Sequence, residues 1–258
     1  MTDGRKFLLI FGTLFLCVFL PTYASVPFDQ QDMMLVIKDV FIQTSIAYLW
    51  FSPVIHLVTI ILIITIFRYG RRTNKIADAF FGFLFLFIAF SNHIATTENY
   101  GLVVITGNVV QIAIVGLLWL WDAWKPRNVF VFQPLPLWRY WVVPLAILAF
   151  WSPISADLSP DFNPMLLVTS SFGVMFCPTT PVVISLLTII YPRVNKYVLG
   201  VTSFVGLLIG VFNAISLIIM PGYSVWNFVL HLPLIFISLY GLLITKIVKR
   251  TFDGKIGT

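Results

Sequence analysis

The sequence predicts an all-α protein, a polytopic bundle of helices embedded in a membrane. Of its 258 residues, 59% are hydrophobic and 10% are charged, and the mean hydropathy is +0.98. Soluble domains carry about 25% charged residues, so this chain lacks the polar residues needed to cover a water-facing surface. Apolar runs long enough to cross a bilayer recur along the chain. The net charge of +6 does not indicate a nucleic-acid partner, because the basic residues lie between the apolar runs.

Residues 1–24 are predicted to be a signal peptide. Arg5 and Lys6 precede the apolar run 7–20, which is short for a membrane span. Small residues at the last and third-last positions suit cleavage after Ala24. The alternative is an uncleaved first helix.

Residues 25–47 are predicted to form an outer interfacial segment, because their apolar positions recur near helical spacing among charged ones. A transmembrane domain at 48–246 follows, and residues 247–258 form a cytoplasmic tail. We expect seven spans in this domain, one for each of its apolar runs. These runs are apolar on all sides, as helices embedded in lipid are. Their predicted ranges are 48–68, 76–92, 101–122, 139–155, 165–190, 197–220 and 225–246.

Lysine and arginine gather in alternate loops, which predicts the orientation of the chain. The basic set comprises Arg68, Arg71, Arg72, Lys75, Lys125, Arg127, Arg139, Arg193, Lys196, Lys246, Lys249, Arg250 and Lys255, whereas the opposite loops carry Glu98, Asp157 and Asp161. By the positive-inside rule the basic loops are cytoplasmic. The predicted location is therefore the cytoplasmic (inner) membrane, with the N terminus outside and the C terminus inside.

The fifth predicted span contains a motif that is expected to break it, Cys177-Pro178-Thr179-Thr180-Pro181. The two prolines remove two backbone donors, and their rings open the helix. The freed carbonyls need partners, such as the threonine hydroxyls, a neighbouring helix or water in a cavity. We therefore interpret Cys177, Pro178, Thr179 and Thr180 as candidates for substrate binding or gating. The alternative is a structural kink.

Three histidines, His56, His93 and His231, are predicted to lie at or outward of the bilayer midplane, as is Cys177. Imidazole and thiolate ligands suit a soft or borderline metal ion such as Cu(I) or Zn(II), so these four residues are the candidate metal ligands. The histidines are also candidates for the approach of a substrate from the outside. The alternative is that each histidine hydrogen-bonds a backbone carbonyl and that Cys177 is a packing residue.

Two further patterns lie on the predicted spans. Ser52, His56 and Thr59 share one helical face of the first span, which predicts a water-accessible flank. Gly206 and Gly210 follow a small-residue spacing that lets helices approach closely, which predicts packing rather than a binding site.

Several activities are disfavoured by the sequence. A rhodopsin needs a Schiff-base lysine in the middle of its last helix, but Lys246 lies at the cytoplasmic end. No acidic residue falls in the middle of a predicted span, which disfavours a proton pump built on a carboxylate relay. Phosphate-loop, zinc-protease and nucleophile-elbow motifs are missing, so a hydrolytic enzyme is not favoured. An enzyme based on Cys177 and a histidine is still an alternative, because the fold could bring the two residues together although they are distant in the sequence.

A set of features after the first segment is shared with other membrane proteins. These are Phe172-Gly173 followed by Cys177-Pro178-Thr179-Thr180 within a span, the acidic amphipathic start at 27–31, and His93 at the outer end of the second span. In these features the chain resembles a family of prokaryotic multi-spanning membrane proteins of unknown function. The resemblance covers nearly everything after the signal segment. It points to Cys177 and His93 without assigning a mechanism.

The broken fifth span carries the leading functional hypothesis. Broken helices that line a cavity form the midplane sites of many transporters. We therefore expect a small-solute or metal-ion transporter or channel-like protein. The alternative is a non-catalytic membrane subunit that binds a partner complex, a lipid or a quinone. The lipid bilayer is the predicted partner, and a membrane complex or a second copy of the chain are further candidates.

Overall fold

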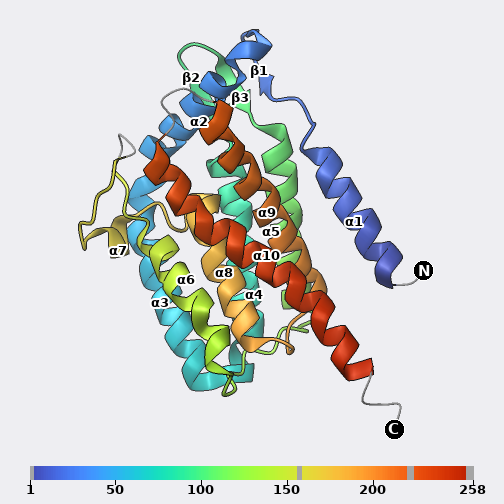
Figure 1. Ribbon diagram of the computed structural model, residues 1–258. Coiled ribbons are helices and arrows are strands. Elements are labelled where there is room, and N and C mark those ends of the chain that lie inside the picture. Colours follow the sequence, from blue (N-terminus) through green and yellow to red (C-terminus); the bar gives the residue numbers. More distant parts are fainter. Residues whose placement is uncertain (1–2, 156–158, 220–223, 254–258) are drawn as a thin grey trace.

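Residues 3–155, 159–219 and 224–253 are described by a computed structural model, in which the helices form a bundle with a small sheet at one end (Figure 1). We call the opposite end, which holds the turns at 70–73 and 191–195, the basic end. Asp157, residue 220 of the sixth predicted span and residues 254–258 of the predicted tail lie outside the described residues.

The helices follow the apolar runs of the sequence. They are α1 Asp3–Cys17, α2 Met33–Tyr48, α3 Ser52–Tyr69, α4 Asn74–Ser91, α5 Thr106–Trp124, α6 Val142–Trp151, α7 Leu166–Thr169, α8 Phe176–Ile190, α9 Lys196–Ile219 and α10 Val225–Asp253. Short 3-10 turns precede four of them, namely η1 Gln30–Asp32, η2 Leu49–Phe51, η3 Gly70–Thr73 and η4 Leu137–Trp141. Every predicted span therefore contains helix.

Helix length and composition support a membrane protein. Within the described residues, four helical runs are long and apolar enough to cross a bilayer: Gln30–Ser91, Thr106–Trp124, Lys196–Leu217 and Val225–Thr245. The apolar helices Phe7–Cys17, Leu137–Trp151 and Phe176–Ile190 are shorter than the roughly 20 residues that a span needs. Helix length and composition thus confirm the helical membrane class. They do not show seven full-length spans.

The described residues are mostly helical, consistent with the all-α prediction, but they also form a three-stranded antiparallel sheet that was not predicted. Strands β2 Ile94–Thr97 and β3 Gly101–Val104 form a hairpin, and β1 Tyr23–Ala24 pairs with the other edge of β3. Gly101 adopts a φ of 62°, which favours glycine and permits the turn into β3. The third predicted span therefore begins at Thr106 rather than at residue 101, because the first residues of that range pair as a strand.

The predicted interfacial segment is helical from Met33 onward and covers this sheet. Val36 and Val40 of α2 are fully buried and form a separate small core with Val103 and Ile105. The apolar face of α2 thus packs on protein at the sheet end. This contact explains why apolar residues recur at helical spacing in the segment.

The predicted signal segment packs against the bundle as helix α1. Phe11 stacks on Phe204 of α9 with ring centroids 4.4 Å apart, and Leu14 is buried in the main core. Gln111 Nε2 donates to the Leu14 carbonyl at 3.1 Å. Ala24, the residue before the predicted cleavage point, is paired with β3.

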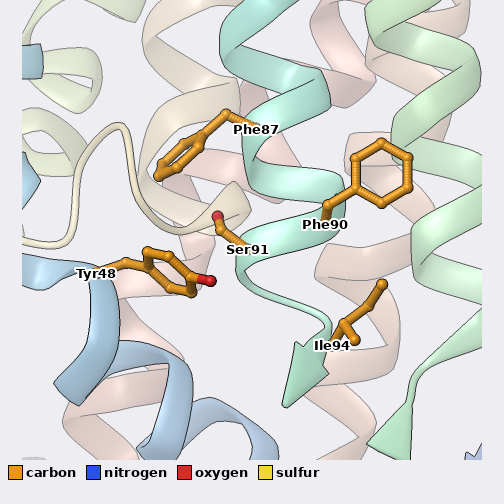
Figure 2. A pocket seen from close by; sticks show the side chains of 5 residues that line it. All are labelled: Tyr48, Phe87, Phe90, Ser91 and Ile94. Carbon is orange, nitrogen blue, oxygen red and sulfur yellow. The ribbon is translucent and has the colours of Figure 1, made fainter.

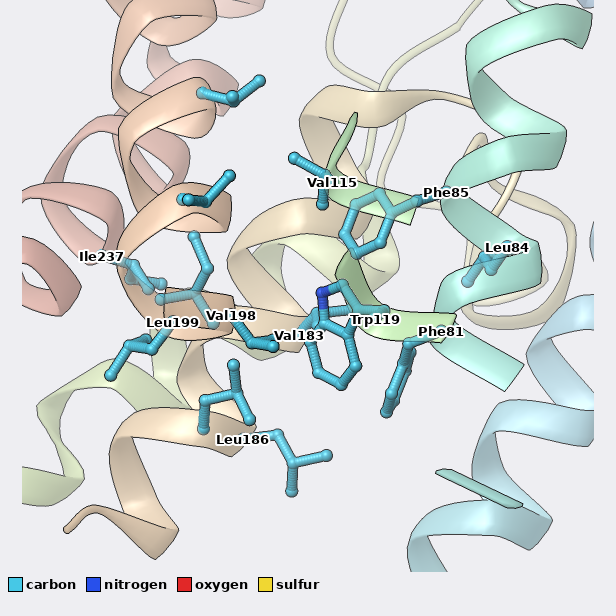
Figure 3. Close-up of a cluster of buried hydrophobic side chains, with 14 of the residues drawn as sticks. Phe81, Leu84, Phe85, Val115, Trp119, Val183, Leu186, Val198, Leu199 and Ile237 are labelled. Carbon is cyan, nitrogen blue, oxygen red and sulfur yellow. The ribbon is translucent and has the colours of Figure 1, made fainter. Parts of the chain in front are cut away.

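The main core lies between helices that are distant in the sequence. Figure 3 shows Phe81 and Phe85 of α4 beside Trp119 of α5, with Val183 of α8 and Val198 of α9 nearby. The Trp119 indole N–H donates to Thr202 Oγ1 at 3.1 Å, so the largest buried side chain has a polar partner. These contacts hold α4, α5, α8 and α9 together.

Small residues let α9 and α10 approach closely, as the spacing of Gly206 and Gly210 predicts. A Cβ at position 206 would overlap Ser238 Oγ, and one at 210 would lie 2.9 Å from Ile235 Cγ1. Gly241 of α10 faces Ser203 of α9 in the same way. The packing interpretation of Gly206 and Gly210 is confirmed.

We expect Gly206→Ala to destabilise the protein by about 1–3 kcal/mol, because the new methyl group must displace α10. Thermal unfolding in detergent would measure the change. Gly12→Ala is the matched control, since a Cβ at that position on α1 meets nothing within 4 Å. The double variant Gly206→Ala/Ser238→Ala should regain part of the loss. Unchanged stability of Gly206→Ala would contradict the close approach.

Candidate functional site

The fifth predicted span is interrupted upstream of the predicted position. Helix α7 ends at Thr169, and α8 begins only at Phe176. Pro178 therefore lies in the first turn of α8, where its missing N–H leaves no helical hydrogen bond unmade. The prediction that Cys177-Pro178 breaks a helix is wrong for this reason. Pro181 does lie inside α8, and the helix continues through it.

The non-helical residues 170–175, which we call the α7–α8 break, are held by specific contacts. Gly173 has a φ of 78°, and a Cβ there would overlap Ile55 of α3. The Gly173 N–H donates to Thr179 Oγ1 at 2.7 Å, and the Thr179 hydroxyl donates to the Met175 carbonyl at 2.6 Å. Thr179 therefore positions the start of α8 and has its hydrogen-bonding capacity used.

His56 fastens the same break to α3. Its Nδ1 lies 2.8 Å from the Ser52 carbonyl, and its Nε2 lies 3.2 Å from Ser170 Oγ. The Ser52 hydroxyl donates to the Ser170 carbonyl, and the Ser170 hydroxyl lies 2.9 Å from the Phe150 carbonyl. A carbonyl oxygen only accepts, so His56 Nδ1 carries a proton, and the single hydroxyl proton of Ser170 is donated to the Phe150 carbonyl. We call Ser52, His56 and Ser170 the His56 clasp.

The clasp changes the interpretation of the polar face of α3. Ser52, His56 and Thr59 are all fully buried in the protein. The predicted water-accessible flank is therefore wrong, because this face is enclosed by protein, and its residues Ser52 and His56 contact Ser170 of the α7–α8 break.

His93 and His231 lie in other parts of the fold. His93 follows α4, is 2% exposed, packs edge-on against Phe41 and places Nδ1 3.2 Å from the Ile88 carbonyl. His231 lies in α10 with Nδ1 2.7 Å from the Asn227 carbonyl. Each of these histidines thus bonds a backbone carbonyl, as the alternative interpretation predicts.

The predicted metal ligands are not gathered into one site. No group of three or more His, Cys, Asp or Glu side chains suited to a metal ion occurs in the part of the chain that the structure describes. Cys177 is partly buried and packs against the main core. The described residues therefore offer no assembled ligand set for a soft metal.

Three residues with buried hydroxyls lie along the contacts between α8, α9 and α10. Thr180 Oγ1, Ser203 Oγ and Ser238 Oγ are buried and have no hydrogen-bond partner among the described residues. Ser238 Oγ and Thr180 Cγ2 are both neighbours of Gly206, and Ser203 Oγ is a neighbour of Gly241. We call Thr180, Ser203 and Ser238 the hydroxyl seam. Buried polar atoms without partners call for water or a solute, or mark a site that rearranges.

A second polar cluster, at the basic end, was missed in the sequence. Asp78 of α4 and Asp122 of α5 are both fully buried, together with Asn128. Asn128 Nδ2 donates to Asp78 Oδ1 at 2.8 Å, and Asn195 Nδ2 donates to Asp122 Oδ1 at 2.7 Å. Both acids fall near the same end of two neighbouring predicted spans, which is the signal that could have paired them.

An apolar hollow lies between α2, α4 and β2 (Figure 2). It has a volume of about 380 Å³ and is lined by Tyr48, Phe87, Phe90, Ser91 and Ile94. The Ser91 hydroxyl is buried and lacks a hydrogen-bond partner within residues 3–155, 159–219 and 224–253. A neighbouring hollow of about 330 Å³ shares Tyr48 and Ile94. Aromatic walls with the hydroxyls of Tyr48 and Ser91 suit an amphipathic ligand.

Comparison of the chain with protein-family models, with curated proteins and with solved structures gives no match. The class that the fold defines, by helix length and composition, is that of a helical membrane protein.

We expect His93 to make the fold sensitive to acid. Burial lowers the pKa of His93 from 6.5 to about 4, although hydrogen bonds to backbone carbonyls oppose this change. Between these values the unfolded chain binds a proton and the folded chain does not, so stability is full above pH 6.5 and falls as the pH drops toward 4. A difference of one between the folded and unfolded pKa values corresponds to about 1.4 kcal/mol of stability.

The variant His93→Gln keeps a side-chain donor but does not titrate. The fall in melting temperature between pH 7 and pH 5 should therefore be smaller in His93→Gln than in the unmodified protein. An equal fall in both proteins would show that His93 is not the group responsible.

Proposed function

We propose that this chain is a small-solute transporter or channel-like protein of the cytoplasmic membrane. In this proposal the seven predicted segments all reside in the bilayer, with the basic end in the cytoplasm and the sheet end outside. The fifth segment enters as the short helix α7, turns at the α7–α8 break and continues as α8. The site lies at the start of α8, between the break and the hydroxyl seam.

The observation that carries the proposal is non-helical backbone in the protein interior. Phe172 and Val174 of the α7–α8 break are at most 1% exposed, and Gly173 contacts α3. Non-helical backbone at membrane depth is tolerated where it is buried in protein or lines a water-filled cavity. Transporters commonly form their substrate sites at such discontinuous helices.

The hydroxyl seam gives this site its polarity. Thr180 lies one turn into α8, directly after Thr179, and its hydroxyl has no partner in the described part of the chain. Ser203 and Ser238, on the facing helices, add two more hydroxyls that have no hydrogen-bond partner among the described residues. Three uncharged hydroxyls suit a neutral hydrogen-bonding solute or water better than a bare ion, because a hydroxyl offers only a partial charge to balance that of an ion.

We expect the double variant Thr180→Val/Ser238→Ala to slow the flux of small neutral solutes by at least about tenfold, the cost of losing roughly 1.4 kcal/mol of polar interaction along the path. The flux is measured by light scattering of proteoliposomes after mixing with glycerol, urea or water. Thr65→Val is the matched control, because Thr65 lies on an exposed part of α3 and bonds the Ile61 carbonyl of its own helix.

The proposal predicts flux above that of protein-free vesicles for at least one of these probes. Equal flux for Thr180→Val/Ser238→Ala and for Thr65→Val would remove the seam from the path. Absence of any flux above protein-free vesicles would count against transport of neutral solutes.

The alternative function, a subunit that binds a lipid or quinone, is favoured by the apolar hollow. Tyr48 and Ser91 place hydroxyls beside the rings of Phe87 and Phe90 (Figure 2). We expect Phe90→Ala or Ser91→Leu to reduce the amount of co-purified lipid or quinone, measured by mass spectrometry of an organic extract. Phe83→Ala on the exposed face of α4 is the control. An extract with no bound lipid or quinone at stoichiometric level would exclude this function.

A further inference from the structure

The two buried acids at the basic end are served by very different numbers of donors. Asp122 Oδ2 accepts from the Asn128 N–H at 3.0 Å and the Arg127 N–H at 3.4 Å, and its Oδ1 accepts from Asn195 Nδ2 at 2.7 Å. Three N–H donors stabilise an ionised carboxylate, even one that is fully buried. Both carboxyl oxygens of Asp122 thus have hydrogen-bond donors.

Asp78 is served by a single donor among the described residues. Asn128 Nδ2 donates to Asp78 Oδ1, whereas Asp78 Oδ2 is buried and receives no hydrogen bond from any of them. Asn128 bridges the two acids, because its Nδ2 donates to Asp78 Oδ1 and its backbone N–H donates to Asp122 Oδ2, so the two carboxyl groups are electrostatic neighbours. An ionised Asp78 would therefore leave an unpaired oxygen buried beside a second carboxylate, which is a costly arrangement.

The side-chain amides of Asn128 and Asn195 cannot rotate to donate a further hydrogen bond to Asp78 Oδ2. Asn128 Oδ1 accepts from the Asn195 N–H at 2.7 Å, so its Nδ2 must point to Asp78. Asn195 Oδ1 accepts from the Tyr197 N–H at 3.0 Å, so its Nδ2 must point to Asp122. The orientation of both carboxamides is thus determined by backbone donors, and the free oxygen of Asp78 keeps its place.

The charged groups of the adjoining segments do not fill the gap. Lys75 on α4 and Arg127 after α5 are exposed, and Arg193 and Lys196 lie on either side of Asn195. The one hydrogen bond to the Asp78 side chain among the described residues comes from Asn128 Nδ2. Asp78 Oδ2 therefore has no hydrogen-bond partner among the described residues.

We propose that Asp78 and Asp122 form a binding site for a single proton, which is held on Asp78 Oδ2 and donated to Asp122. One proton satisfies the free oxygen and removes the like-charge contact, as in other carboxyl pairs that share a proton. A metal ion is a poor occupant, because the surrounding N–H donors present positive rather than negative ends to the site.

The proton site deepens the transport proposal, on which its role in coupling rests. The cluster joins α4, α5, the segment after α5 and the start of α9 through hydrogen bonds. Loss of the proton would leave two negatively charged carboxylates side by side. Their repulsion would favour separation of the elements that carry them. Uptake of a proton at the basic end would thereby change how tightly the start of α9 packs. Helix α9 also carries Ser203 of the hydroxyl seam.

The occupancy can be measured without any transport assay. Infrared spectroscopy of the full chain in nanodiscs at neutral pH should show the C=O band of one protonated carboxylic acid, which shifts in D2O. The chain has nine aspartates and one glutamate, so labelling with 13C-aspartate assigns the band to an aspartate. Exposed carboxyl groups are ionised at this pH and give no such band.

Two substitutions locate the band. Asp78→Asn should abolish it and keep the fold, because the Asn amide can donate to Asp122 as the protonated acid does. Asp29→Asn, at an exposed position before η1, should leave it unchanged. By contrast Asp122→Asn should lower the melting temperature, since one side of its amide must face the N–H of Asn128 or Asn195.

Three outcomes would overturn the proposal. These are the absence of a protonated aspartate band in the unmodified protein at neutral pH, its persistence in Asp78→Asn, and its loss on adding Na⁺ or Ca²⁺, which would identify a metal ion as the occupant. A negative flux experiment with glycerol, urea or water would leave the band untouched, so failure of the transport proposal and failure of the proton site are separable.

Discussion

The need to satisfy every polar backbone group in an apolar interior governs this structure. Helices meet that need by themselves, but the α7–α8 break does not. Its residues depend on side chains from elsewhere: the Thr179 hydroxyl bonds Gly173 and Met175, and Ser52 with His56 bonds Ser170. Because these partners come from α3 and α8, the position of α8 and the packing of α3 are determined together.

The two ends of the bundle are organised by different physics. At the sheet end, apolar contacts between α2 and β3 form a small separate core. At the basic end, hydrogen bonds from Asn128 and Asn195 to Asp78 and Asp122 join segments that are distant in the sequence. Between the ends, α9 and α10 approach at Gly206 and Gly241, where small residues allow close contact but leave hydroxyls without partners among the described residues.

Polar groups thus lie in three parts of an otherwise apolar bundle. These are the His56 clasp, the hydroxyl seam, and the two buried acids Asp78 and Asp122, which we call the acid pair. The members of the clasp bond one another and the neighbouring backbone, and therefore support structure. The seam and the acid pair each keep atoms that lack a partner in the described part of the protein, and such atoms are the ones that a solute or a proton can serve. The histidines and Cys177, which are the candidate ligands in the sequence, have ordinary structural partners.

The sequence by itself determined the membrane class, the helical segments and the packing role of Gly206, because composition, apolar run length and small-residue spacing are local properties. Contacts between distant segments were decided only by the tertiary structure. The partners of His56 include Ser170, and the partners of Asp78 include Asn128 and Asp122, none of which adjoin in the chain. The position of the α7–α8 break was also tertiary, because Pro178 is compatible with a first helical turn and with a break alike. The hydrogen bonds that residues 170–175 make with α3 and α8 determine that Pro178 lies in a first helical turn and that the break precedes it.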